Sequence, residues 1–223
     1  MKIKFIFLVI TLVFPLLVSS TALAVDNYGY YLRAGTGLTY SELDSGGLNT
    51  AGPHPNTGSD QDNRVLLDLS LGKGWGALRT QIDYSFRHSD FRTNSFQPPT
   101  PTFFYLSSVL TKTISLSTYY DLSFGENGFY EPFLGAGAGG TYYDVEVSDG
   151  VVFASDSDTS LSYFGTVGIG FKHSEQVKTE LGYRYYDFGE FDVDLFGFGG
   201  LPAGNFEGDL IAHEVFVGVR YMF

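Results

Sequence analysis

The chain has 223 residues, a net charge of −12 and no cysteine, and it contains 21 Phe, 16 Tyr and 28 Gly. The lack of cysteine excludes disulfides and thiolate metal sites. The acidic charge disfavours nucleic acid as a partner, since binding to phosphates needs a basic surface. A mean hydropathy near zero does not exclude the membrane, because alternating barrel strands average out.

The amino terminus has the parts of a secretory signal peptide. Lys2 and Lys4 precede an apolar run over residues 5–18, and residues 22–24 read Ala-Leu-Ala. The run is shorter than the roughly 20 apolar residues of a spanning helix, which disfavours the alternative of an uncleaved anchor. We predict cleavage after Ala24, with residues 25–223 as one barrel domain. The mature chain then keeps 11 basic and 25 acidic residues, a net charge of −14.

Period-2 alternation of apolar and polar residues predicts eight strands. Their approximate ranges are residues 29–41, 64–72, 77–89, a segment within 103–123, a strand beginning near Tyr130, and residues 160–172, 177–188 and 213–223. The third strand is the clearest, because apolar residues at 78, 82, 84 and 86 alternate with Arg79, Asp83 and Arg87.

Local features add detail to these strands. Residues 72–76 predict a tight turn, and Lys112 interrupts an apolar face, which predicts a bulge or an extension above the bilayer there. Residues 133–139 carry Gly at every second position, so bare backbone on one face leaves room for long side chains from opposite strands. A dinucleotide-binding role for this Gly run is disfavoured, because no helical pattern follows it.

The terminal strand and the connections indicate the architecture. Val215, Val217, Val219, Tyr221 and Phe223 share one face, and the opposite face carries charge. Short and long connections alternate along the chain, as in even-stranded bacterial barrels with both termini in the periplasm. A soluble barrel or sandwich is the alternative, but it would place charge outside. We predict an all-β, eight-stranded antiparallel up-and-down transmembrane β-barrel in the bacterial outer membrane.

Several segments resemble a known family. Residues 130–139, 181–189 and 217–223 resemble the fifth, seventh and eighth strands of small opacity-protein-like, OmpA-type outer-membrane barrels, and residues 118–122 resemble the fourth. The resemblance implies insertion by the barrel-assembly machinery, with the terminal strand and its Tyr221 and Phe223 as the assembly signal. It does not imply one function, since such barrels include adhesins, structural proteins and narrow pores.

The inner faces of the predicted strands carry six basic and six acidic side chains. Buried charges persist only when they are paired or hydrated, and an eight-stranded barrel is barely wide enough for its own side chains. The balance predicts a salt-bridged plug, with Arg220 beside Glu180 and Arg79 beside Asp121. The set comprises Arg33, Asp68, Arg79, Asp83, Arg87, Asp121, Glu131, Lys178, Glu180, Arg184, Glu214 and Arg220.

Four long connections, at about residues 42–63, 90–102, 144–159 and 189–209, are predicted to form acidic outer loops. Asp156, Asp158, Asp192 and Asp194 are weak candidates for Ca²⁺ ligands, but they lack the spacing of a calcium loop, so solvated acidic loops are favoured. The last loop also carries apolar residues that predict either a contact surface or self-packing. These are Phe191, Leu195, Phe196, Phe198, Leu201 and Phe206.

A hydrolase needs a nucleophile within hydrogen-bond reach of its base. His88 and His213 lie near the outer rim on strands that are not neighbours, His54 lies in the first loop, and His173 lies in a periplasmic turn. We therefore predict a non-enzyme without cofactor or resident metal.

The predicted function is a structural or adhesive surface role through the outer loops. Expected partners are outer-membrane lipid, lipopolysaccharide, the assembly machinery and a host or cell-surface ligand, with the protein a monomer. A narrow diffusion pore is the alternative, and a lipid A-modifying enzyme is less favoured.

Overall fold

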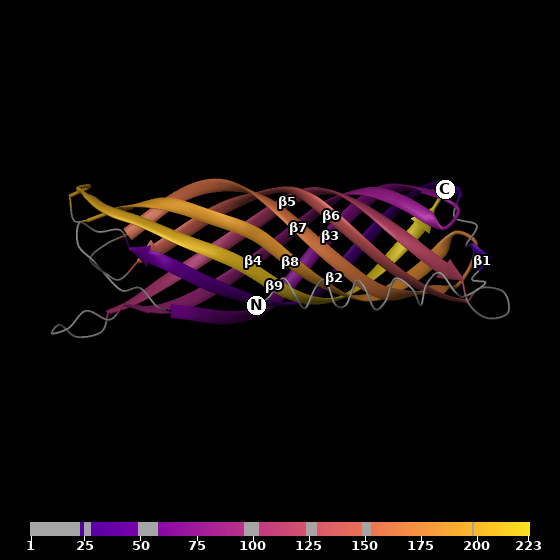
Figure 1. The fold of residues 1–223 in the computed structure, drawn as a ribbon, viewed down its shortest axis with the longest axis horizontal. Coiled ribbons are helices and arrows are strands. Elements are labelled where there is room, and N and C mark those ends of the chain that lie inside the picture. The colour runs from indigo at the N-terminus through magenta and orange to yellow at the C-terminus, as the bar shows by residue number, and fades with distance from the viewer. Residues whose placement is uncertain are drawn as a thin grey trace, which may run out of the picture.

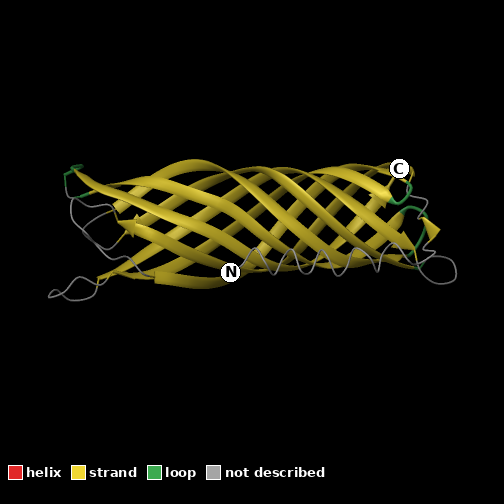
Figure 2. Cartoon of the chain, viewed as in Figure 1, coloured by secondary structure: helices red, strands yellow, loops and turns green. Residues whose placement is uncertain are grey.

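The computed structural model describes residues 23–24, 28–48, 58–95, 103–123, 129–148, 153–197 and 199–223. These residues form strands and short turns (Figure 2). No helix within these ranges is long and apolar enough to cross a membrane. The strands are β1 (Leu23–Ala24), β2 (Tyr28–Leu48), β3 (Gly58–Trp75), β4 (Leu78–Ser95), β5 (Phe103–Ser123), β6 (Tyr130–Ser148), β7 (Phe153–Lys172), β8 (Val177–Phe196) and β9 (Pro202–Met222).

Strands β2 to β9 close into a barrel (Figure 1). Each pairs antiparallel with its neighbour in sequence, and β2 pairs with β9 to close the ring, so the predicted eight-stranded barrel is confirmed. The two-residue β1 pairs with Leu122 and Ser123 of β5 at the end where the carboxyl terminus lies. β1 falls on the last residues of the predicted signal peptide, and the preceding part of that peptide lies outside the described residues.

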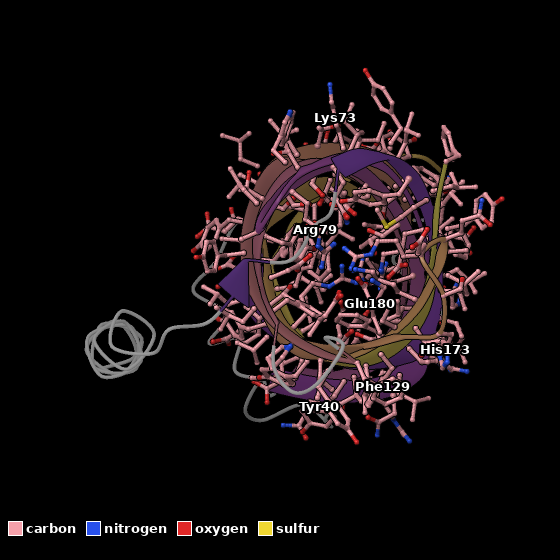
Figure 3. All side chains as sticks on the ribbon, turned by 90° about the vertical axis from the view of Figure 1, so that its right-hand side faces the viewer. Tyr40, Lys73, Arg79, Phe129, His173 and Glu180 are labelled. Carbon is pink, nitrogen blue, oxygen red and sulfur yellow. The ribbon has the colours of Figure 1, made fainter. Side chains whose placement is uncertain are left out.

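The half of the barrel nearer the carboxyl terminus has the surface of a membrane protein. Its outward side chains are mostly apolar, with exposed fractions of 66% at Leu38 and 62% at Ile114. In Figure 3, Lys73, Phe129 and His173 point away from the barrel, while Arg79 and Glu180 point into it.

Two rings of aromatic side chains encircle the barrel at the two ends of this apolar band. The lower ring, at the end nearer the carboxyl terminus, comprises Tyr30, Trp75, Tyr120, Tyr130 and Tyr221. The upper ring, at the other end of the band, comprises Tyr40, Tyr142, Tyr163, Tyr183 and His213. Tyr30 and Tyr40 are ten residues apart, which for a tilted strand is about 25 Å, the height of a lipid-facing band.

The strands continue well past the upper ring, because they contain 18 to 21 residues and a membrane crossing needs about 9–11. We call this part, residues 41–48, 58–64, 87–95, 103–111, 143–148, 153–162, 186–196 and 202–212, the outer extension. The four long acidic loops of the sequence prediction were therefore wrong: most of their residues belong to paired strands. Asp149, His54 and Phe198 lie outside the described residues.

The polarity of the wall inverts in the outer extension. Most inward side chains there are apolar and buried, beside a few hydroxyl groups such as those of Ser41, Ser89 and Thr111. The apolar ones belong to one cluster that includes Leu43, Phe91, Val109, Val145, Val147, Phe188, Phe191, Val193, Leu195, Phe206 and Leu210. The outward positions carry Glu42, Asp44, Glu146, Glu190 and Asp209, which are exposed or half-buried. Water surrounds this part of the wall, so apolar side chains are more stable inside it.

The outer extension also divides into two sheets. The β3–β4 ladder ends at the pair Leu66–Arg87, and the β7–β8 ladder is interrupted between the pairs Tyr163–Asp187 and Phe153–Phe196. The other ladders continue outward, so β4-β5-β6-β7 faces β8-β9-β2-β3 across the apolar cluster. This is the arrangement of a β-sandwich, whose core lies between two sheets.

Three local predictions need comment. β5 runs through Lys112 without a register shift, so the predicted bulge does not form. The strand instead extends past the upper aromatic ring, the other predicted possibility, and Lys112 lies over the Tyr142 ring at 5.5 Å. The turn predicted at residues 72–76 is wrong, because β3 continues to Trp75 and the turn is at Gly76, whose φ of 72° suits glycine. The bare backbone of the Gly run does admit large neighbours, since a Cβ at Gly135 would clash with the Tyr119 ring.

The register change in the β8–β9 ladder lies between Asp187 and Glu190, where Gly189 has a φ of 76°. This bulge keeps Phe188 and Phe191 on the inner face, although they are three residues apart. Sequence alternation alone assigns them to opposite faces. Of the two predicted alternatives for the apolar residues of this segment, self-packing is confirmed for Phe191, Leu195 and Phe206, which are each 1% exposed. Phe196 and Leu201 remain exposed.

We predict that Phe191→Ala loosens the outer extension while the membrane part stays folded. Truncating a fully buried Phe costs about 3–5 kcal/mol through lost burial and the cavity left behind. Hydrogen–deuterium exchange should accelerate across residues 186–196, while heat-modifiable gel migration persists. Leu201→Ala, at a position 68% exposed, is the matched control and should leave exchange unchanged. Equal exchange in both variants would contradict an apolar core in this region.

Candidate functional site

The structure places all twelve predicted inward charges inside the barrel. Each is at most 6% exposed, and Glu214 is fully buried. They come from seven of the eight barrel strands, since β7 contributes none. The period-2 alternation positions them, because their sequence neighbours face the surroundings of the barrel.

Eleven of the twelve charges form one continuous chain of ion pairs along the lumen. At the end of the lumen nearer the carboxyl terminus, Lys178 Nζ lies 2.6 Å from Glu131 Oε2. Arg220 then reaches Glu131 at 3.6 Å, Asp121 at 3.2 Å and Glu180 at 3.4 Å. Arg79 lies 3.0 Å from Asp121 and 3.3 Å from Glu180. The two pairs predicted from the sequence, Arg220 with Glu180 and Arg79 with Asp121, are both present.

The chain continues toward the outer extension through Arg33. Its guanidinium lies 2.7 Å from Glu180 and 2.5 Å from Asp68. Arg184 then links Asp68, at 3.4 Å, to Glu214, at 2.6 Å, and Glu214 also pairs with Arg87. Each acid contacts at least one base, so the network is compensated throughout its length.

Asp83 is held differently from the other acids. Among the described residues it has no ion pair, and its carboxylate accepts hydrogen bonds from the hydroxyls of Ser70, at 2.6 Å, and Ser117, at 2.5 Å, and from the amide of Gln81. Gln81 also accepts a bond from Arg79 at 3.1 Å, which joins Asp83 to the chain. Three donors stabilise a buried carboxylate without a cationic partner.

Arg87 marks the boundary between the charged lumen and the apolar extension. Its guanidinium pairs with Glu214 and lies 4.8 Å from the centre of the Tyr186 ring and 4.9 Å from that of Phe188. These two rings stack at 4.2 Å with an interplanar angle of 9°, and Phe164 stacks on Tyr186 at 4.9 Å. The ion-pair network therefore ends against an aromatic layer.

We predict that Glu180→Ala destabilises the barrel most among single luminal changes. Glu180 contacts Arg33, Arg79 and Arg220, so its removal leaves three buried guanidiniums short of compensation, at a cost of about 3–5 kcal/mol. Urea unfolding in lipid vesicles should show the loss. Glu190→Gln on the outer surface is the control, with a change within about 0.5 kcal/mol. A similar midpoint for both variants would show that the network does not stabilise the fold.

Outside the lumen, carboxylates bridge the open β3–β4 seam. Asp62 accepts the Asp90 backbone N–H at 2.7 Å, and Asp60 accepts the Arg92 N–H. Arg64 reaches Asp62 at 2.9 Å and Asp90 at 2.7 Å. Partial burial works in the opposite direction, but the hydrogen bonds from Asp90 and Arg64 hold the pKa of Asp62 below its usual range. The aspartates thus replace ladder hydrogen bonds that the separated strands cannot make.

The same seam brings together three residues that sequence reasoning did not connect. His88 Nε2 lies 3.1 Å from Asp90 Oδ1 and 3.3 Å from the hydroxyl of Ser108. Ser108 lies opposite Asp90 in the β4–β5 ladder, 20 residues beyond His88 in the chain. Both partners meet the same ring nitrogen, whereas a catalytic triad uses one nitrogen for the nucleophile and the other for the acid. The arrangement is a hydrogen-bond cluster without that relay geometry.

The weak metal candidates serve the second seam. Asp158 accepts the Asp192 backbone N–H at 2.9 Å, and Asn205 donates to Asp192 at 2.8 Å. Asp156 accepts from the Ser157 N–H at 2.8 Å. Among the described residues, no group of three or more His, Asp or Glu side chains is arranged to hold a metal ion.

The two other described histidines and the carboxyl terminus lie on the outer surface of the barrel. His213 forms a hydrogen bond with Tyr183 at 2.6 Å within the upper aromatic ring, and His173 with Thr179 at 2.8 Å. At the carboxyl terminus, the Phe223 N–H donates to the Tyr30 carbonyl at 3.0 Å, and Tyr221 lies opposite Leu32 and Val177.

We predict that Asp62→Ala opens the β3–β4 seam. The Asp90 amide would lose its acceptor, so its deuterium exchange should accelerate while total stability falls by about 0.5–1.5 kcal/mol. Because the pKa of Asp62 is lowered by folding, its contribution is present above the unfolded value of 3.8 and is lost as pH falls through the folded pKa. Exchange of the Asp90 amide, corrected for intrinsic rates, should therefore also accelerate below about pH 3.8. Protection that is independent of both changes would contradict the bridging role.

Comparisons with known proteins agree with this architecture. Residues 10–223 match the family described as outer membrane protein beta-barrel domain. Among solved structures, OprG from Pseudomonas aeruginosa is 13% identical with a TM-score of 0.59, covering 89% of this chain and 99% of that one. AlkL is 17% identical with a TM-score of 0.53, covering 88% and 91%. Neisserial surface protein A is 21% identical with a TM-score of 0.48, covering 87% and 97%. A comparison with curated proteins gives no match.

Proposed function

Because this chain belongs to the outer membrane protein β-barrel family of the bacterial outer membrane, we propose that it is a non-enzymatic surface protein whose lumen is closed and whose outer extension makes the functional contacts. The observation that carries the proposal is that the polarity of the inner and outer faces inverts between the membrane part of the barrel and the outer extension. Charges fill the membrane part of the barrel, and an apolar core fills the extension. Both fillings leave the outer faces of the strands as the surface that a partner can reach.

The luminal network supports a closed barrel rather than a narrow pore. A permanent water path needs hydrated side chains along it, but the twelve charges are at most 6% exposed. Four nitrogen and oxygen atoms of these charges, Arg79 Nη2, Arg87 Nη2, Arg220 Nε and Glu180 Oε1, have no hydrogen-bond partner among the described residues. Arg79 Nη2 and Arg220 Nε nevertheless lie within 3.4 Å of Glu180 Oε1, and Arg87 pairs with Glu214 through its Nε. The aromatic layer above Arg87 adds a second obstruction.

The outer extension supports a contact role. Its sheets have a packed apolar core, so it presents its outward side chains on a rigid support and not on long loops. Directly opposed acids face outward across three strands, where Asp209 lies opposite both Asp44 and Glu190. Like charges placed opposite each other are destabilising. Because the packing of the sheet does not require acids at these outward positions, their cost in stability supports a role for this surface in recognition.

Two further partners belong to the same proposal. The apolar band between its aromatic rings contacts membrane lipid, with lipopolysaccharide around the upper ring. The terminal strand, ending in Tyr221 and Phe223 with an exposed aromatic side chain at Phe223, provides the signal for the barrel-assembly machinery. Cleavage after Ala24 would release the barrel with β2 as its first strand.

Planar-bilayer recordings test the closed lumen. The purified full-length protein should give no stable conductance steps, because salt-bridged side chains obstruct the path. Glu180→Ala should give intermittent openings selective for anions, since it leaves an excess of buried positive charge. A stable nanosiemens-scale conductance from the unmodified protein would contradict the proposal and favour the diffusion pore.

Cell-binding assays test the contact role. Bacteria that produce the protein should bind host cells or other cell surfaces at least fivefold more than bacteria that lack it. A variant with each outer hairpin closed by a two-residue turn at the cross-strand pairs Tyr40–Asn63, Phe86–Lys112, Tyr142–Thr159 and Tyr185–His213 should lose this binding. Heat-modifiable migration verifies that this variant is folded. Equal binding by both forms would show that the outer extension is not the contact site.

A further inference from the structure

One groove lies in the outer extension on the sheet β4-β5-β6-β7. Its volume is about 520 Å³, within the range of small-ligand sites. It lies along two outward rows of the sheet. In one, Asp90 lies opposite Ser108, Ser108 opposite Glu146, and Glu146 opposite Ser155; in the other, Leu106 and Phe153 flank Ser148.

The position of the groove separates it from the lipid. In β5, Leu106 is six residues beyond Lys112, which lies at the upper aromatic ring. Six residues of a tilted strand rise about 15 Å along the barrel. Leu106 and Phe153 are nevertheless 62% and 50% exposed. Apolar side chains exposed in water, beside a groove with a polar rim, are typical of a binding surface.

The chemistry of the lining restricts the occupant. No Lys or Arg is among the described residues that line the groove, so a sulfated or phosphorylated ligand would meet carboxylates without a compensating cation. Asp90 is already paired with Arg64 and His88, which leaves Glu146 as the main charged acceptor. Serine hydroxyls, which both donate and accept, supply most of the remaining polar groups of the lining.

The backbone under the groove argues against an extended peptide. Such peptides are held mainly by backbone groups at a free sheet edge. The β4–β5, β5–β6 and β6–β7 ladders are continuous beneath the groove, so the backbone groups that face these ladders are occupied, and only the seam edges of β4 and β7 at its two sides are open. Recognition there depends on side chains: one carboxylate and several hydroxyls for hydrogen bonds, and the Phe153 ring for an apolar face.

We propose that this groove binds an uncharged oligosaccharide of two to four sugar units. Sugar hydroxyls complement the Glu146 carboxylate and the serines, and the C–H face of a pyranose ring packs on Phe153. The four strands span about 14 Å at their usual spacing of about 4.8 Å, which matches a short oligosaccharide. This inference rests on the proposed contact role and assigns a ligand class to it.

The test uses the full-length protein in detergent and an array of neutral di- to tetrasaccharides built from hexoses and N-acetylhexosamines. A sulfated heparin oligosaccharide and a Lys-rich decapeptide serve as the other arms. At least one neutral oligosaccharide should bind, with an affinity at least tenfold lower for both Phe153→Ala and Glu146→Gln. Leu201→Ala and Glu175→Gln, at exposed positions outside the groove, should leave the affinity unchanged.

Several outcomes would overturn the inference. The first is that no neutral oligosaccharide binds. The second is that an oligosaccharide binds equally well to the groove variants, which would place its site elsewhere. The third is that heparin or the peptide binds and only the groove variants remove this binding, which would assign the groove to another ligand. Cell binding that needs the outer extension but tolerates both groove variants would refute the groove and keep the proposed contact role. If bacteria that produce the protein bind cells no better than bacteria that lack it, while the purified protein still binds a neutral oligosaccharide, the contact role is refuted and the ligand class of the groove is kept.

Discussion

The structure depends on the medium around the barrel wall. Every strand alternates with period 2, and the wall is one residue thick, so the surroundings at each level decide what lies inside. Where lipid surrounds the wall, the twelve charges lie inward; where water surrounds it, the apolar cluster does. A single strand such as β8 follows both rules, because Glu180 and Arg184 lie inside near one end and Val193 and Leu195 lie inside near the other.

The two fillings meet at Arg87. Its ion pair with Glu214 completes the charged network, and its contacts with Tyr186 and Phe188 begin the aromatic layer. A guanidinium suits this boundary, because it binds carboxylates through its edge and aromatic rings through its face. The boundary lies close to the upper aromatic ring, where Tyr183 and His213 form the outward hydrogen bond on the same two strands as Arg184 and Glu214. The change inside the barrel thus coincides with the change outside it.

Period-2 alternation was sufficient to predict the barrel, its closure and the inward position of all twelve charges, because each depends on local face assignment. It was insufficient for the outer extension. Acids at Glu190, Asp192 and Asp194 alternate with apolar residues there, but with lipid assumed outside, that pattern was interpreted as an acidic loop. The bulge at Gly189 obscured the pattern further. The cluster of His88, Asp90 and Ser108 depends on the β4–β5 register, and no local pattern specifies which residues of two strands become neighbours.

The most direct test of this inversion measures what surrounds single outward positions. The chain has no cysteine, so single variants such as Val217→Cys and Glu190→Cys accept one spin label each. In lipid vesicles, the label at position 217 should collide mainly with oxygen, which concentrates in lipid, and the label at position 190 mainly with a water-soluble nickel chelate. A label at Val193→Cys should be shielded from both. Oxygen-dominated relaxation at position 190, or free access of the chelate at position 193, would contradict the account.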